Sequence, residues 1–372
     1  MAVIKIAYII PSLDAGGAER FTIDMLSSLD RSRFAPELLL FAHGGFFLES
    51  AKAAGIPVTI LNKRWKIDPV NFWKLYKALK AMAPDIVHTS LGGDIYGRLA
   101  AKMLGIKLII STEQNVNSDE IWWMRLIKRF TARFAKVIVV ISEAVRTDTK
   151  KRYHVPDERL IKIYNGISTE RFSLCQPHQE RTIIEGGSVG RLVPQKNYSL
   201  LLHALALTPE LPIKIKIIGE GKLRGELENL AANLGVSDRV SFSGPSADIP
   251  GFLQTLDFFI LTSSWEGLGN VILEAGLCGL PVISSRVDGP AEIIKDGESG
   301  LLFHNGIVTD LADKLKLLVE MHESGADRRL GEALRKRVLK DFDIKVVTKR
   351  YEELYESLFA SLPPKVIESQ IA

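Results

Sequence analysis

The sequence predicts an α/β protein of two domains, each built on an open parallel β-sheet with helices on both faces. Three observations support this: the length of 372 residues, a regular alternation of short β-branched runs with amphipathic stretches, and one polar interruption near mid-chain. Such a length suits two or three domains of roughly 150 residues each. With 46% hydrophobic and 25% charged residues, the composition is that of a folded globular protein.

Seven runs in the first half predict parallel strands, with helices in the gaps between them. They are Ile4–Ile10, Glu37–Phe41, Val58–Leu61, Asp85–His88, Leu108–Ser111, Val137–Ile141 and Leu160–Tyr164. The alternation then lapses into a polar segment over residues 165–179 that contains Gly166 and Pro177. This composition is typical of a linker, so we assign residues 1–171 to the first domain.

The alternation resumes in a second domain over residues 172–344. Strands are predicted at Ile183–Val189, Ile213–Ile218, Val240–Phe242, Phe258–Leu261 and Pro281–Ser284, and helices near Ile307–His322, Asp327–Lys340 and Lys345–Leu358. We expect the last helix, over residues 345–360, to pack back on the first domain. Because parallel sheets bind ligands at the carboxyl ends of their strands, substrates should meet in a cleft between the domains.

Charge and cysteine content exclude several classes of function. Residues 1–171 carry 26 Lys and Arg against 17 Asp and Glu, and the remaining residues carry 22 against 27. The excess of positive charge in residues 1–171 is too small for a nucleic-acid-coating protein, but it allows this half to bind an anionic ligand or a membrane surface. No apolar run approaches the ~20 residues of a membrane span. Two cysteines, Cys175 and Cys278, are too few for a disulfide framework or a thiolate metal site, which favours a cytoplasmic location.

Two loops that follow predicted strands carry groups suited to an anion. Gly16 and Gly17 lie between the first strand and the first helix, where glycines let backbone amides approach a phosphate. A tight turn alone would also explain them. Arg191 and Lys196 lie in the loop after the first strand of the second domain, where they could neutralise a diphosphate, Arg as a planar fork and Lys as a point charge. Exposed loop cations without a ligand are the alternative.

The segment Ser263–Gly276 is the most informative part of the sequence. A strand ends at Leu261, a glycine-rich turn follows, and a helix begins near Gly269, so free amides lie where phosphate or sugar oxygens can bind. Glu266 and Glu274 would lie about 12 Å apart if every intervening step were helical at ~1.5 Å per residue, too far for a glycosidase acid/base pair. They suit different hydroxyls of one extended ligand, a structural Glu274 being the alternative.

Taken together, these motifs resemble the retaining family 4 glycosyltransferases of the GT-B fold, which have two Rossmann-like domains and an interdomain cleft. The resemblance rests on Glu266 and Glu274 with seven residues between them, on Gly190-Arg-Leu-x-x-x-Lys-Asn197, and on Gly16-Gly-Ala-Glu-Arg20. Asn165-Gly-Ile167, Gly219-Glu-Gly221 and Asp296-Gly-x-x-Gly-Leu-Leu302 are similar to further family elements, so the likeness extends over nearly the whole chain.

The resemblance implies a transferase that moves a sugar from a nucleoside diphosphate, most often UDP in the family, to a glycan or lipid-linked acceptor of a surface polysaccharide or glycolipid. Arg191 and Lys196 would bind the diphosphate, Glu266 the transferred sugar and Glu274 the ribose. Gly16 and Gly17 would approach the phosphates from the first domain, and the amides of Gly267, Leu268, Gly269 and Asn270 would bind sugar or phosphate. No metal or other cofactor is implied, because preset cations can stabilise the departing diphosphate.

Two departures from the family concern the acceptor proton. Many members carry histidine where this chain has Gln114, and glutamine cannot titrate. His88 resembles the first histidine of a His-x-His element whose second position here is Ser90. His88 or Asp94 are therefore candidates for a catalytic base, a packed and hydrogen-bonded His88 being the alternative. We favour a second route, in which the departing phosphate oxygen takes the acceptor proton.

Residues 121–136 carry five cations, four aromatics and no acid. At helical spacing one face is apolar (Trp123, Ile127, Phe130, Phe134) and another basic (Arg125, Arg129, Arg133, Lys136). This predicts either a sheet-covering helix with a solvated basic side or a helix at an anionic membrane surface. Residues 62–66 and 72–74, which combine tryptophan with cations, favour the membrane, and hence a cytoplasmic protein peripheral to the inner face of the cell membrane.

Two other functions stay open at this stage. The UDP-sugar 2-epimerases share the architecture, but they need acid/base carboxylates that we do not locate in this sequence. A catalytically weak nucleotide-sugar-binding protein is the other alternative, because Gln114 cannot act as an acid or base.

Overall fold

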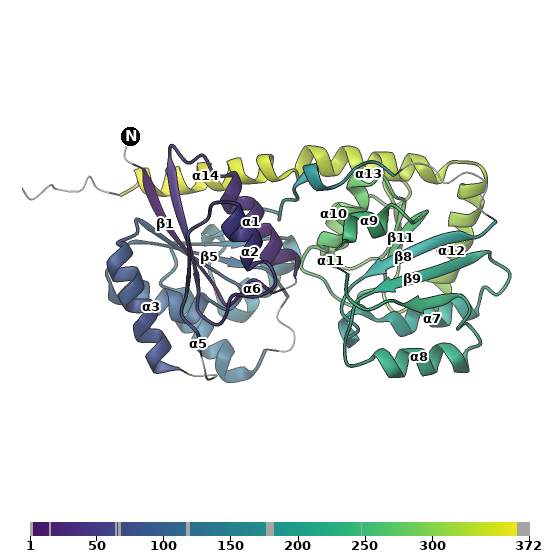
Figure 1. Ribbon diagram of the computed structural model, residues 1–372, viewed down its shortest axis with the longest axis horizontal. Coiled ribbons are helices and arrows are strands. Elements are labelled where there is room, and N and C mark those ends of the chain that lie inside the picture. The colour runs from purple at the N-terminus through teal and green to yellow at the C-terminus, as the bar shows by residue number, and fades with distance from the viewer. Residues whose placement is uncertain are drawn as a thin grey trace, which may run out of the picture.

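Two parallel β-sheets lie side by side in the computed structural model, each flanked by helices (Figure 1). The structure describes residues 3–14, 16–63, 65, 68–116, 120–175, 182–246 and 248–362. The strand order is β3-β2-β1-β4-β5-β6-β7 in the first sheet and β10-β9-β8-β11-β12-β13 in the second. Neighbouring strands are parallel throughout both sheets. The predicted α/β class with two sheets is confirmed.

The strands fall close to the predicted runs, and their bounds differ mostly by one to three residues. They are β1 Ile4–Ile10, β2 Phe34–Leu40, β3 Val58–Ile60, β4 Ile86–Ser90, β5 Leu108–Glu113, β6 Val137–Val140, β7 Leu160–Lys162, β8 Ile184–Val189, β9 Ile213–Ile218, β10 Val240–Phe242, β11 Phe258–Leu261, β12 Val282–Ser285 and β13 Leu301–Phe303. The edge strand β13 is an addition that the sequence did not predict.

Helices connect successive strands and cover the sheets. Those of the first domain are α1 Gly17–Ser28, α2 Leu48–Ala53, α3 Pro69–Met82, α4 Asp94–Met103, α5 Trp122–Ala132 and α6 Glu143–Tyr153, with short 3₁₀ turns at η1 Asp157–Arg159 and η2 Thr169–Arg171. Those after β8 are η3 Pro194–Lys196, α7 Tyr198–Ala206, α8 Arg224–Asn233, α9 Ile249–Leu253, α10 Asn270–Leu277, α11 Asp288–Ile293, α12 Val308–Glu323, α13 Asp327–Asp341 and α14 Ile344–Ala360.

The last helix, α14, returns to the first domain and lies along it in Figure 1. The chain returns from the second domain to the first near Phe342, whose carbonyl oxygen accepts a 2.8 Å hydrogen bond from Ile167 N. Tyr351 and Tyr355 of α14 are fully buried in one core with β1 and α1. The amphipathic pattern of residues 345–360 thus buries its apolar face against the first sheet. Pro177 of the predicted linker lies outside the described residues, as do Arg64 and Lys66.

The strand orders fix where ligands can bind. In the first sheet the order reverses between β1 and β4, and in the second between β8 and β11. Open parallel sheets bind ligands at the carboxyl ends of the strands beside such a switch point. The loops that follow β8 and β11 carry Lys196 and Glu266, and the loop after β1 carries Gly16 and Gly17. All the loops predicted to bind the donor therefore follow switch-point strands.

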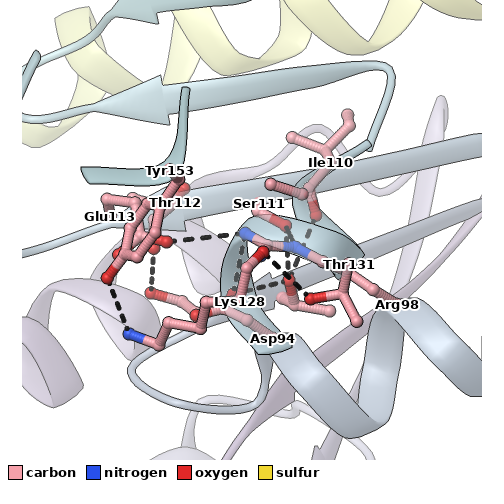
Figure 2. Close-up of polar contacts among 12 residues, drawn as sticks. Asp94, Arg98, Ile110, Ser111, Thr112, Glu113, Lys128, Thr131 and Tyr153 are labelled. Atoms are coloured by element: carbon pink, nitrogen blue, oxygen red, sulfur yellow. Dashed lines mark hydrogen bonds and ion pairs between the residues drawn. The ribbon is translucent and has the colours of Figure 1, made fainter. Parts of the chain in front are cut away.

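A network of buried charged side chains lies between β5 and the helices that cover it (Figure 2). Arg98 of α4 is completely buried, and its Nε donates to Ser111 Oγ at 2.7 Å. Its Nη2 lies 3.5 Å from Glu113 and 3.6 Å from Asp94. Lys128 of α5 extends the network, with its Nζ 3.0 Å from Glu120. Burial raises the pKa of Glu113, while the cations Lys128 and Arg98 oppose this shift.

This network turns α5 away from the predicted orientation. A sheet-covering helix should bury its apolar face, but α5 buries Lys128, Thr131 and Ala132. Ile127 and Phe130 of the predicted apolar face are exposed instead. The cations predicted on the basic side, Arg125, Arg129, Arg133 and Lys136, do meet solvent. Part of the predicted apolar side meets solvent as well, because Lys128 points inward to reach buried carboxylates. Helix α5 also ends at Ala132, so Arg133 to Lys136 continue outside it.

Candidate active site between the two domains

An ion pair joins the two loops at the switch point of the second sheet. Lys196 Nζ, in η3, lies 2.6 Å from Glu266 Oε1, in the loop after β11. Ser263 Oγ donates to the same oxygen at 2.7 Å. The side chains of Lys196 and Glu266 are only 14% and 11% exposed. A cation and a carboxylate that are 70 residues apart in sequence are thereby held together beside strand ends that suit a ligand.

Several side chains that sequence reasoning missed hold these two loops in place. Gln195 Nε2 donates to Trp265 O at 3.0 Å, and Thr262 Oγ1 donates to Lys196 O at 2.8 Å. Asn305 Nδ2 donates to Ser264 O at 2.9 Å. These bonds fix the backbone around Lys196 and Glu266. Their signal in the sequence is only proximity to the motif, because polar side chains that bind carbonyls have no characteristic spacing.

Two glycines allow the domains to approach each other here. A Cβ on Gly17, the first residue of α1, would lie 2.7 Å from Asn270 Nδ2 in the second domain. A Cβ on Gly267 would lie 2.3 Å from the carbonyl oxygen of Gln114 in the first. The contact at Gly267 is with backbone, so this arrangement of the domains requires glycine there, whereas at Gly17 the side chain of Asn270 would have to move to admit a Cβ. Gly16 is the N-cap residue of α1.

Helix α10 begins beside Glu266 and directs its free amides toward the same region. Gly269 is its N-cap residue, in a left-handed conformation with φ 89°, and Asn270 is its first residue. Leu268 is buried and anchors the turn. The first amides of a helix lack intrahelical partners and favour negative charge. The turn and helix start predicted from Ser263–Gly276 thus lie where the prediction put them.

Glu274 occupies the middle of α10, apart from the Lys196 pair. Burial raises the pKa of Glu274 to about 7, although Arg171 and Arg20 act in the opposite direction. Arg20 belongs to α1, where its Nε lies 3.0 Å from Asp24 Oδ1. Cations from the first domain and from η2 therefore face a carboxylate of the second. Arg20 was quoted in the sequence motif without a role, and Arg171 had no signal at all.

Arg191 lies exposed in the loop after β8. Burial raises the pKa of Glu19 in the first turn of α1, and the positive charge of Arg191 opposes this shift. The charge of Arg191 therefore acts across the domain boundary on the helix that follows the Gly16-Gly17 turn.

Gln114 and Asn165 form a buried amide pair where the first domain meets Gly267. Asn165 Nδ2 donates to Gln114 Oε1 at 2.8 Å, and both side chains are at least 95% buried. Gln114 Nε2 and Asn165 Oδ1 have no partner among the described residues. One amide donor and one carbonyl acceptor stay unsatisfied whichever way the two amides are flipped together. Both atoms are buried, so the pair is a neutral, shielded group next to Gly267.

His88 does not join the site, which corrects its selection as a catalytic residue. It is fully buried in β4, with Nδ1 2.7 Å from Tyr355 Oη and Nε2 2.7 Å from Thr112 Oγ1. Burial lowers the pKa of His88 to about 3. Because both ring nitrogens are occupied inside the core, no acceptor oxygen can reach them. The alternative of a packed, hydrogen-bonded histidine is the one that the structure supports.

Asp94 is equally remote from solvent. It accepts a 2.8 Å hydrogen bond from Thr89 Oγ1 and faces Arg98 in the buried network.

An Asp-x-Asp sequence, which binds metal in some enzymes, occurs at Asp341–Asp343. Here Asp343 caps helix α14 instead, because its side chain accepts a 2.7 Å hydrogen bond from Lys345 N. Among the described residues, no helix is long and apolar enough to cross a membrane.

Two family models match the chain one after the other. The model for Glycosyltransferase Family 4 matches residues 15–171, and the model for Glycosyl transferases group 1 matches residues 168–337. Their junction coincides with the predicted domain boundary. Together they span residues 15–337, which include every strand except β1.

Curated relatives and solved structures extend this similarity. A lipopolysaccharide core biosynthesis glycosyltransferase LpsE of Rhizobium meliloti is 33% identical over 54% of this chain and 58% of its own length. A UDP-Gal:alpha-D-GlcNAc-diphosphoundecaprenol alpha-1,3-galactosyltransferase of Escherichia coli is 25% identical over 95% of this chain and 96% of its own. The crystal structure of Anabaena HepE in complex with UDP and glucose superposes with a TM-score of 0.83 at 22% identity, covering 95% of this chain and all of that one.

Proposed function

The chain belongs to the glycosyltransferases, with a family 4 domain followed by a group 1 domain, and from this premise we propose that it transfers a sugar with retention from a UDP-sugar. The proposed acceptor is a glycan or a lipid-linked glycan of a surface polysaccharide or glycolipid. The observation that carries the proposal is the Lys196–Glu266 pair, 2.6 Å apart, at the switch point of the second sheet and next to Gly267, which approaches Gln114 of the first domain.

UDP is the proposed nucleotide because two independent similarities point to it. The Escherichia coli relative that aligns over 95% of this chain is named for UDP-Gal, and the superposed HepE structures hold UDP or UDP-glucose. The relatives' names also refer to lipopolysaccharide core and to diphosphoundecaprenol acceptors. We extend both features to this chain as part of the proposal.

Each site residue has a proposed role that follows from its charge and position. Lys196 and Arg191 neutralise the diphosphate, whose charge grows as the bond to the anomeric carbon breaks. Glu266 accepts hydrogen bonds from the transferred sugar, and the amides of residues 267–270 bind sugar or phosphate oxygens. Glu274 binds the ribose hydroxyls. These preset charges remove the need for a metal in the proposed mechanism.

The acceptor proton is proposed to leave with the donor phosphate. His88 is sealed in the core, Asp94 is paired with Thr89 and Arg98, and Gln114 cannot titrate. The departing phosphate oxygen lies on the face from which a retaining transfer proceeds, so it can take the proton as it leaves. The protein then positions both substrates and stabilises charge.

We further propose that residues 121–136 contact an anionic membrane surface on the cytoplasmic side. Trp122 and Leu126 are more than half exposed on α5, and Arg125 and Arg129 are exposed beside them. Apolar side chains next to cations are typical of helices that lie in the membrane interface. Lipid-linked acceptors are found at such a surface.

A thermal-shift screen against UDP-, GDP- and ADP-sugars, followed by product analysis, tests this function. A ligand that binds only the folded state at 100 times its Kd adds about 2.7 kcal/mol of stability, so UDP and one UDP-sugar should raise the Tm. The stabilising UDP-sugar should then yield UDP and a glycoside. A free epimer as product would indicate a 2-epimerase, and stabilisation without turnover a binding protein. No shift with any nucleotide would contradict the donor site.

A further inference from the structure

A pocket of about 200 Å³ opens beside α5, on the first domain and outside the proposed transfer site. It lies between the end of α5, the end of α6 and the turn η1. Four of its lining residues are cationic or titratable bases: Arg129, Arg133, His154 and Arg159. None of the lining residues is a carboxylate. A concave site with several guanidinium groups and no acid is complementary to an anion.

The side chains of the pocket are held in place without neutralising partners. Arg159 Nη2 donates to Ala132 O at 2.7 Å and also to Ala135 O, which fastens it to the end of α5. Arg133 stacks on the Phe130 ring at 4.2 Å. His154 Nδ1 donates to Lys151 O at 3.0 Å, so Nε2 is the ring nitrogen left for another partner.

Nearby acids do not cancel this charge. Asp157 pairs with Arg146 and Lys150, at 3.0 and 3.5 Å. Burial and the neighbouring Arg98 lower the pKa of Arg159, and Glu158 only partly opposes them. Among the residues that the structure describes, no ion pair involves Arg129, Arg133 or Arg159. The pocket is therefore a site of uncompensated positive charge.

Exposed apolar side chains adjoin the pocket on α5. Trp122, Leu126 and Phe130 are 66%, 53% and 49% exposed, and their spacing of four residues places them along one side of the helix. Arg129 and Arg133, also four residues apart, run beside them. A soluble anion would make no contact with this apolar ridge, whereas a lipid presents an anionic head group directly next to apolar chains.

We propose that this pocket binds the phosphate group of a membrane lipid, with Arg129, Arg133 and Arg159 around the phosphate and the Trp122–Phe130 ridge in the acyl boundary. Arginine suits this role because its planar fork matches phosphate oxygens. The inference rests on the proposed membrane contact of residues 121–136 and makes it specific. It assigns binding to a discrete site rather than to diffuse positive charge.

Vesicle flotation with charge-matched variants tests the proposal. The pocket variant is Arg129→Gln with Arg133→Gln, and the control is Arg125→Gln with Lys136→Gln, which removes two exposed cations of the same segment outside the pocket. The vesicles are phosphatidylcholine made anionic by phosphatidic acid or, at equal surface charge, by oleate. On phosphatidic acid the pocket variant should lose at least ~10-fold more affinity than the control, about 1.4 kcal/mol. On oleate the two variants should lose the same.

Three outcomes would overturn the inference. Equal losses by the two variants on phosphatidic acid would mean diffuse charge only, and would leave the proposed membrane contact intact. Failure of the wild type to bind any anionic vesicle would remove that contact as well. Glycerol 3-phosphate binding as tightly as the vesicles, measured by calorimetry, would assign the pocket to a soluble phosphate. Should the double variant melt early, exposed Arg129→Gln alone replaces it, compared with Arg125→Gln.

Discussion

Replacing Lys196 with alanine should lower kcat by more than ~100-fold, because loss of one preorganised group at developing charge typically costs that much. The ammonium lies 2.6 Å from Glu266, at the position proposed for the leaving diphosphate. Its removal also leaves the Glu266 carboxylate unpaired beside the donor. Glu266→Ala should cause a loss of similar size, because that carboxylate is proposed to contact the sugar as its ring distorts. Steady-state kinetics with the identified UDP-sugar measure both.

A matched control variant and separate effects on kcat and KM make this prediction specific. Lys214 is exposed at the amino end of β9, whereas the site lies at the carboxyl ends of the strands. Lys214→Ala should therefore leave kcat unchanged. Glu274→Ala should instead raise the donor KM more than it lowers kcat, since ribose contacts are nearly the same in ground and transition states. Normal turnover by a folded Lys196→Ala enzyme would refute the proposed role of this lysine.

The Arg98→Met variant should lose about 3–5 kcal/mol of unfolding free energy in the first domain, as expected when one partner of a buried ion pair is removed. Arg98 is completely buried and faces Asp94 and Glu113 (Figure 2). Methionine fills a similar volume but provides no positive charge. Asp94, Glu113 and Glu120 would then share the interior with Lys128 alone. Urea denaturation followed by tryptophan fluorescence measures the loss.

The control for this variant is Lys52→Met on α2. Lys52 pairs with Glu49 at 2.8 Å, three residues away on the same helix, and both side chains are more than half exposed. Exposed pairs of this kind contribute roughly 0.3–0.5 kcal/mol, so the control should remain close to the wild type. Equal stabilities of Arg98→Met and Lys52→Met would show that the buried network contributes no more than a surface pair.

The fold was largely predictable because parallel strands leave a strong local signal. β11 matches its predicted range because it is a continuous apolar run that is buried along its whole length. β9 matches because its buried isoleucines alternate with lysines at the period of a strand. β10 and β13 each have only three residues, too few to show a period, and β13 (Leu301–Phe303) was the one missed. It becomes a strand only through pairing with β12, a tertiary effect.

The site was predictable in its residues and not in its contacts. Glycine-rich turns after strands identify Lys196 and Glu266 as neighbours of a ligand, but their 2.6 Å contact depends on the order of β8 and β11 in the sheet. The Gln114–Asn165 pair joins residues 51 positions apart, and no spacing signals it. His88 was wrongly predicted to be catalytic because a histidine at a strand end gives the same sequence pattern in a core as in an active site.

Helix α5 shows why periodicity alone can fail. The apolar face of residues 121–136 predicts burial of that face, but Lys128 has buried partners, Glu120 and Tyr153, that lie in other segments. Satisfying a charge in the interior outweighs burial of the apolar face, since an unpaired buried carboxylate is far more costly. The exposed apolar ridge is the result, and it carries the proposed membrane contact.

The anomer released first from an α-linked UDP-sugar tests the central claim most directly. In the absence of acceptor, water takes the place of the acceptor hydroxyl, and proton NMR distinguishes α- from β-sugar before the anomers interconvert. A retaining site, in which the departing diphosphate takes the proton on the same face, predicts that the α-anomer appears first together with UDP. Initial release of the β-anomer would contradict the proposed mechanism and would require a base on the opposite face of the sugar.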